Sequence, residues 1–160
     1  MSRRTSIADA FRKRVDDCLN GTKTDKYYSN LYGNVSDKVY KFEEISEFPY
    51  VGIQVGTETF QYEPSRQKWN FLGISVFIYV RGEDDAEEQL ELLIEDLKTI
   101  IDSEEDLHYT ITKPDGSTVD AQTTEMTMNS VDTDEGMFKP FGFAEIQLTI
   151  RYTGDRRLYR

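Results

Sequence analysis

The sequence predicts an α+β fold with a mostly antiparallel or mixed β-sheet of about four main strands, two helices and a small extra hairpin. Apolar residues recur at helical spacing in two segments, and they alternate along four others at about 49–56, 69–81, 124–133 and 141–152. The predicted order is helix, two strands, helix, hairpin, two strands. Because strands follow one another directly, antiparallel pairing is favoured over repeated strand–helix crossovers.

The first helix is predicted at about residues 6–20. Ile7 and Phe11 begin an apolar stripe at helical spacing. Ser6 stands at the expected N-cap, with Asp9 three residues later at the capping-box position.

Residues 22–47 sustain no period, although they contain many aromatic and apolar side chains. Connections of this length without structure of their own are uncommon in folded domains. The segment is therefore expected either to fold back on its own core or to dock on a neighbouring protein.

The strand at 69–81 is apolar on both faces, which is typical of a central strand covered on both sides. With only two helices available, one of the two covers is expected to come from another subunit. Residues 57–67, which contain Pro64, are interpreted as a polar excursion between strands.

The second helix has the most regular pattern in the chain, with apolar residues from Ala86 to Ile101 on one continuous face. Its first turn follows the acidic run Glu83–Asp85. Acidic side chains at a helix start are favoured by the helix dipole, so this explanation is preferred to a metal site.

The rest of the chain predicts a hairpin at 108–119, turning at Lys113–Gly116, and then the last two strands. The whole chain, 1–160, is interpreted as one domain with loose ends at about 1–4 and 153–160. No apolar run approaches the length of a membrane helix, and no signal peptide is recognised, so no membrane partner and a cytoplasmic place of synthesis are expected.

Negative charge is concentrated in one element. Residues 83–106 contain twelve acidic residues and one basic residue, for a net charge of −11, which equals that of the whole chain. The remainder is therefore neutral. Nucleic-acid binding through phosphate contacts requires the opposite sign, so no specific DNA binding is expected.

The sequence contains no arrangement of residues typical of catalysis. The single histidine, His108, excludes a two-histidine metal set, and the single cysteine, Cys18, lies on the apolar stripe of the first helix. Residues 132–136 briefly suggest a calcium loop but lack its third acid and the glycine at its sixth position, so a hairpin turn is preferred. No enzymatic activity, cofactor or metal is expected.

Several stretches spread over nearly the whole chain resemble the tail terminator proteins of long, flexible-tailed phages. Their specificity lies in their sum and order, since none is diagnostic alone. They are Arg4–Ala8, Asn30–Ser36, Tyr40–Ile45, Glu47–Val51, Gly56–Thr59, Gln61–Tyr62, Trp69, Phe71–Leu72, Lys113–Pro114, Gly116–Thr118, Thr133–Gly136, Ala144–Ile146 and Arg151–Tyr152.

The resemblance implies a structural virion protein at the head-proximal end of the tail. Such proteins form a hexameric ring that caps the tail tube once the length set by the tape-measure protein is reached. The ring meets tail-tube protein on one face and head-completion or connector proteins on the other, and DNA passes through its lumen. The alternatives are another ring protein of the head–tail neck and a small-ligand regulatory module.

Two sets of residues are candidates for these contacts. Aromatic residues are the expected subunit or partner interface because aromatics dominate binding energies. These are Tyr27, Tyr28, Tyr32, Tyr40, Phe42, Trp69 and Phe71. The acidic face of the second helix, formed by Glu87, Glu88, Glu91 and Glu95, either lines the lumen, where it would repel DNA, or is a solvated outer face.

Overall fold

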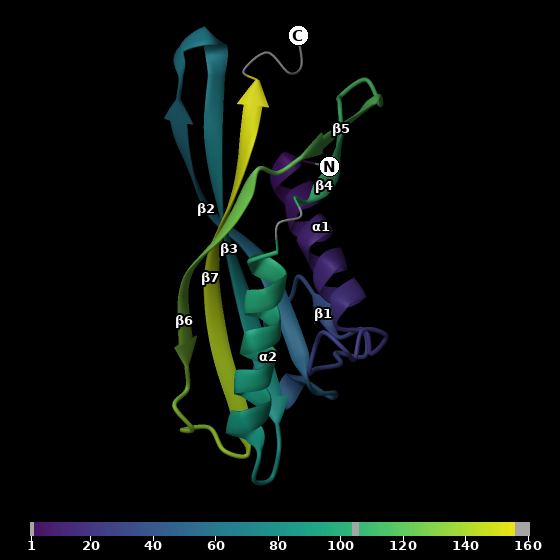
Figure 1. The fold of residues 1–160 in the computed structure, drawn as a ribbon, viewed down its shortest axis with the longest axis vertical. Coiled ribbons are helices and arrows are strands. Elements are labelled where there is room, and N and C mark those ends of the chain that lie inside the picture. Colours follow the sequence, from purple (N-terminus) through teal and green to yellow (C-terminus); the bar gives the residue numbers. More distant parts are fainter. Residues whose placement is uncertain (1, 104–105, 156–160) are drawn as a thin grey trace.

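Helices cover one face of a long, twisted sheet in the computed structural model, which describes residues 2–103 and 106–155 (Figure 1). The α+β class and the order of the main elements are confirmed. In chain order the elements are α1 (Arg3–Cys18), β1 (Val35–Ser36), η1 (Phe42–Glu44), β2 (Tyr50–Tyr62), η2 (Pro64–Arg66), β3 (Gln67–Arg81), α2 (Ala86–Ile101), β4 (His108–Thr112), β5 (Thr118–Gln122), β6 (Glu125–Thr133) and β7 (Phe141–Asp155).

The main sheet has the order β1-β2-β3-β7-β6. All its neighbours are antiparallel except the two-residue strand β1, which runs parallel to β2. The expected hairpin forms a separate pair, β4–β5, and β4 packs against α1. Four long strands therefore form the sheet, as the alternating patterns predicted.

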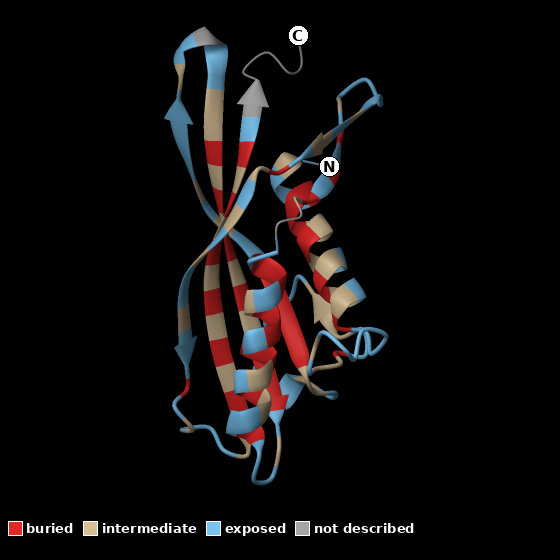
Figure 2. Cartoon of the chain, viewed as in Figure 1, coloured by how far each residue is buried: buried red, intermediate tan, exposed pale blue. Residues whose placement is uncertain are grey.

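A single hydrophobic core lies between the sheet and the two helices. Every second residue of β3 from Leu72 to Val80 is buried there, together with Phe11 of α1 and Leu97 of α2. The alternation of buried and intermediate positions along the central strands is visible in Figure 2. Helix α2 buries one stripe against the sheet and exposes the opposite face, as its apolar periodicity predicts.

The predicted start of the first helix is wrong. Helix α1 begins at Arg3, and its N-cap is Ser2, whose hydroxyl accepts a hydrogen bond from the Thr5 amide at 3.2 Å. Ser6 lies buried inside the helix, and its amide donates to the Ser2 carbonyl. An N-cap side chain was available four residues earlier, so the predicted capping box at Ser6 does not form.

The polar excursion predicted at residues 57–67 is also wrong. Strand β2 continues to Tyr62 and returns through the turn at 64–66 into β3, which gives a long hairpin that projects past the helices (Figure 1). Its polar residues are accommodated because this part of the hairpin is exposed. A register shift between Val55 and Glu58 marks a β-bulge where the hairpin leaves the core.

Neither predicted loose end is loose where the structure describes it. At the start, Ser2 caps α1 and residues 3–4 are helical. At the other end, Thr153–Asp155 pair with residues 67–69 of β3 as the end of β7. Met1 and residues 156–160 lie outside the described part of the chain.

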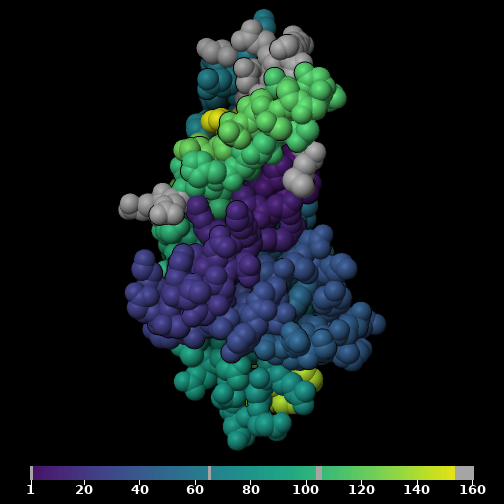
Figure 3. Space-filling model, turned by 90° about the vertical axis from the view of Figure 1, so that its right-hand side faces the viewer, coloured from purple at the N-terminus to yellow at the C-terminus, as the bar shows by residue number. Residues whose placement is uncertain are grey.

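The long connection at 22–47 follows the first of its two predicted courses over much of its length. Leu31 is fully buried and Tyr27 packs against the core, so the segment folds onto its own chain. Figure 3 shows it, in indigo and blue, spread over one side of the molecule. Tyr28 and Tyr32 nevertheless remain largely exposed.

Candidate assembly surfaces

Within residues 2–103 and 106–155, no group of three or more His, Cys, Asp or Glu side chains is placed to hold a metal ion. In the same residues, no helix has the length and apolar character needed to span a membrane. A surface pocket of about 290 Å³ is lined by side chains that include Tyr28, Tyr32 and Leu92, with no acid, histidine or cysteine.

The sheet face that carries no helix is covered at one end by the chain's own aromatic residues. Phe42 of η1 stacks on Phe141 with ring centroids 4.8 Å apart, and it also contacts Tyr79 at 5.8 Å. Tyr40 adds a contact with Tyr50 at 5.3 Å. Part of the second cover expected for the strand at 69–81 therefore comes from residues 40–48 rather than from another subunit.

The seven aromatic candidates do not form one surface. Tyr27, Tyr40 and Phe42 pack against their own chain, whereas Tyr28 and Tyr32 are exposed. Trp69 and Phe71 lie half-buried on the helix-free face, where the Arg151 guanidinium lies 4.3 Å from the Trp69 ring centre. Their role as an interface stays a prediction.

Helix α2 holds the backbone at Tyr28 and Ser29 in place through a buried carboxylate. Asp96 is 1% exposed and accepts hydrogen bonds from the Tyr28 amide at 3.0 Å and the Ser29 amide at 2.8 Å. A buried carboxylate needs such donors, because burial without them is costly. No local pattern indicates this contact, since the partners are 67 and 68 residues apart.

Replacing Asp96 with alanine is expected to lower the free energy of unfolding by about 2–3 kcal/mol, because two part-buried amides lose a charged acceptor. Urea unfolding measures the change. The matched control is Glu95→Ala, one residue earlier and exposed, for which a change within about 0.5 kcal/mol is expected. Equal effects of the two variants would contradict the anchoring role of Asp96.

Tyr32 is presented by an unusual backbone. Its φ of 50° lies in the left-handed region, and its amide donates to the Asn30 side chain at 2.8 Å. Non-glycine residues in this region cost about 1 kcal/mol or more, and such residues cluster at functional sites. With its side chain 73% exposed, Tyr32 is the aromatic candidate most clearly available to a partner.

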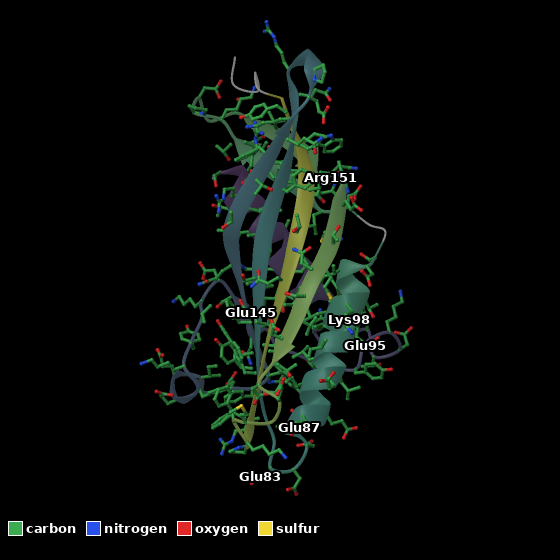
Figure 4. All side chains as sticks on the ribbon, turned by 90° about the vertical axis from the view of Figure 1, so that its left-hand side faces the viewer. Glu83, Glu87, Glu95, Lys98, Glu145 and Arg151 are labelled. Carbon is green, nitrogen blue, oxygen red and sulfur yellow. The ribbon has the colours of Figure 1, made fainter. Side chains whose placement is uncertain are left out.

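The acidic face of α2 is exposed as predicted. Glu87, Glu88, Glu91 and Glu95 all point to solvent. The labelled side chains of Glu87 and Glu95 project away from the sheet in Figure 4. Glu87 lies 3.3 Å from the Lys139 ammonium and Glu95 lies 3.9 Å from that of Lys98, but exposed pairs of this kind contribute little to stability.

Several buried tyrosine hydroxyls resist ionisation. The Tyr152 hydroxyl donates to Glu58 at 2.7 Å, and burial followed by this contact raises the pKa of Tyr152 well above its usual value. Burial, with a hydrogen bond to Cys18, raises the pKa of Tyr27 to about 12. Burial also raises the pKa values of three more tyrosines, Tyr50, Tyr79 and Tyr109.

These shifts predict a loss of stability at alkaline pH. Unfolded tyrosines ionise at a pKa of about 10, whereas the folded ones keep their protons. Above that pH, ionisation therefore lowers the free energy of the unfolded state relative to the folded state. The stability from these groups is fully present below pH about 10 and falls as the pH rises beyond it. Urea unfolding from pH 8 to 11.5 tests this. Tyr152→Phe should flatten the decline, and pH-independent stability up to pH 11 would contradict it.

Sequence reasoning missed the exposed apolar residues of the β2–β3 hairpin. Phe60 is 51% exposed and Tyr62 is 60% exposed, and the Lys68 ammonium lies 4.8 Å from the Phe60 ring centre. The run Thr59–Tyr62 has the Thr, Phe and Tyr content typical of strands. That composition, with a proline turn directly after it, could have revealed the hairpin.

The sequence of this chain matches a known protein family over its full length. A family model described as bacteriophage tail tube terminator protein matches residues 1–160. The tail tube terminator protein p142 of Escherichia phage T5 is 50% identical over 160 residues, covering 100% of this chain and 99% of the relative.

A solved structure shares the fold at low sequence identity. A chain from the virion of a native gene transfer agent particle superposes with a TM-score of 0.51 at 11% identity, over 93% of this chain and 98% of that one. The match over the full length and the 50% identity select the tail terminator over the neck-ring and ligand-module alternatives. The chain belongs to the bacteriophage tail tube terminator family.

Proposed function

We propose that copies of this chain close into a hexameric ring on the end of a completed tail tube and stop its growth. One ring face contacts tail-tube protein at the length set by the tape-measure protein, and the other face receives head-completion or connector proteins. The full-length family match is the observation that carries this proposal. The protein acts by contact alone, without making or breaking covalent bonds.

The architecture supports a ring of this kind. The main sheet has two different edges, one formed by β6 and the other by β2 outside its two-residue pairing with β1, so a contact between them joins unlike surfaces of two copies. Such heterologous contacts generate a closed ring when a whole number of equal rotations between copies completes one full turn. The exposed Tyr28, whose amide is held by Asp96, and the exposed Tyr32 are proposed to contribute to a partner contact.

The acidic face of α2 has two places in such a ring. Turned toward the lumen, its carboxylates would repel phosphate over about 8 Å at physiological salt and let DNA pass without being held. Turned outward, it would be a solvated surface that keeps the particle soluble. The geometry of the ring decides between them.

Tube elongation in vitro tests the function directly. Adding the purified protein to polymerising tail-tube protein is expected to arrest growth at amounts far below one copy per tube subunit, because one ring blocks one end. Tube length is read by electron microscopy over time. Elongation that continues at the control rate, or incorporation of this chain along the tube wall, would contradict the proposal.

A further inference from the structure

The two edges of the main sheet differ from ordinary protected edges. Strand β2 has a second neighbouring strand only at Val51 and Gly52, where β1 pairs with it. Strand β6 pairs with β7 on one side, and the described sheet ends there. Proteins commonly block such edges with proline, lysine or covering loops, yet neither residues 57–62 nor 125–133 contain proline or lysine.

Part of the β2 edge is already used by α1. The Arg12 Nε donates to the Ile53 carbonyl at 3.1 Å, and the Arg4 guanidinium donates to the Gly56 carbonyl. The backbone contacts of these two arginines stop at the β-bulge, and beyond it Arg4 reaches only the Glu58 carboxylate on the helix side, at 3.7 Å. The hairpin portion beyond it, residues 57–62, is therefore the part of this edge that remains accessible to another strand.

Hydrogen-bond alternation shows which backbone groups face outward there. The Glu63 amide donates to the Gln67 carbonyl at 3.0 Å and closes the hairpin. In an antiparallel pair, bonded and non-bonded residue pairs alternate, so Thr59 and Gln61 bond to β3. The amide and carbonyl of Phe60 consequently point away from β3, toward the free side of the edge.

Both edges carry the same two-faced pattern of side chains. On the helix side, the β2 edge carries Val55, Phe60 and Tyr62, with the Glu58 carboxylate turned to Tyr152 between them, and the β6 edge carries Met126, Met128 and Val131. On the helix-free side the corresponding residues are polar: Thr59 and Gln61 on β2, and Thr127, Asn129 and Ser130 on β6. A strand pair that joins the two edges would keep apolar next to apolar and polar next to polar, as register requires.

We propose that the free β2 edge of one copy, residues 57–62, pairs antiparallel with the β6 edge of the next copy and continues the sheet around the ring. This inference rests on the proposed ring. The four long strands β2, β3, β7 and β6 alternate in direction, so β6 and the β2 of the next copy meet antiparallel, as every other long pair does. Each copy has one edge of each kind, which makes a second copy the partner that the pattern fits.

Disulfide cross-linking tests this pairing. Thr59→Cys is combined in turn with Glu125→Cys, Thr127→Cys and Asn129→Cys, all on the helix-free side of the two edges. Within one copy β3 and β7 separate these strands, so the pairs lie about 14 Å or more apart, too far for an intrachain disulfide. The protein is mixed with tail tubes, oxidised and analysed by non-reducing electrophoresis.

The expected result is a ladder of linked copies up to the size of the closed ring for one of the three combinations. No ladder is expected for the matched control variants, which carry only one introduced cysteine beside the natural Cys18. Rings seen at tube ends by electron microscopy without a ladder in any combination would overturn the edge pairing and leave the terminator function intact. Failure of unmodified protein to appear at tube ends would overturn both.

Discussion

Replacing Phe60 with proline is expected to abolish ring formation while leaving the isolated chain folded. Proline removes the outward-facing amide that the next copy's β6 would use, and it is tolerated on an edge strand where the amide faces away from the partner strand. Because no hydrogen bond inside the chain depends on that amide by the alternation of the β2–β3 pair, the unfolding free energy should change by no more than about 1 kcal/mol. Native mass spectrometry with tail tubes, beside urea unfolding of the free chain, measures both quantities.

Phe60→Ala is the control that separates backbone from side chain. It keeps the amide but removes the apolar contact and the neighbouring Lys68 interaction, so it should weaken the ring without abolishing it. A Phe60→Pro protein that still forms complete rings would contradict backbone pairing at this edge, whatever the alanine variant does.

A continuous sheet also fixes which layer faces the lumen. Six copies with four long strands each give about 24 strands, which close at a tilt of about 40° into a cylinder of roughly 24 Å backbone radius. A helix layer packed about 10 Å inside that cylinder would leave a channel of roughly 18 Å, narrower than a DNA duplex. The edge-paired ring therefore places α1 and α2 outside and the helix-free face inside, which favours the solvated outer position for the acidic face of α2.

Lysine substitutions on that inner face are accordingly expected to block DNA passage. Glu145 of β7 and Asp132 of β6 are cross-strand partners there, and the labelled Glu145 is seen on the sheet in Figure 4. The double variant Glu145→Lys and Asp132→Lys would turn a repelling pair into phosphate ligands, each new contact adding about 0.9 to the salt slope of DNA binding. Because a like-charge pair replaces a like-charge pair, the sheet should stay folded.

The matched control reverses the four outer acids, with Glu87, Glu88, Glu91 and Glu95 all changed to lysine. Infectivity of virions carrying each variant is the measurement. We expect a large loss of titre for the double variant at Glu145 and Asp132, with rings still present at tube ends. The variant with four lysines on α2 is expected to keep a near-normal titre. The reverse outcome would place the acidic face of α2 in the lumen and contradict the sheet-inside ring.

Hydrophobic periodicity predicts the elements that are buried on one face and misses those that project from the core. Helix α2 and strand β7 were predicted closely because each has one buried face, and burial imposes a regular pattern on the side chains. The hairpin at 57–67 was missed because it projects from the core, where no burial imposes such a pattern. Its strand character is carried by backbone pairing, which leaves only a weak trace in composition.

The assembly surfaces were harder to predict for a related reason. An aromatic residue indicates an interface only if it does not pack against its own chain. Phe42 and Tyr40 fail this test, because they cover the chain's own sheet. The contact of Asp96 with the Tyr28 and Ser29 amides joins residues far apart in sequence, so only the folded chain reveals it. Which strands form the edges of a sheet depends on the strand order, and no local sequence pattern predicts it.

The central claim is that this chain works by capping a tube end with copies of itself. Electron microscopy of tail tubes mixed with the purified protein tests it most directly. Added ring-shaped density is expected at one end of each tube, with none along the wall. Bare tube ends at saturating protein concentration would contradict it.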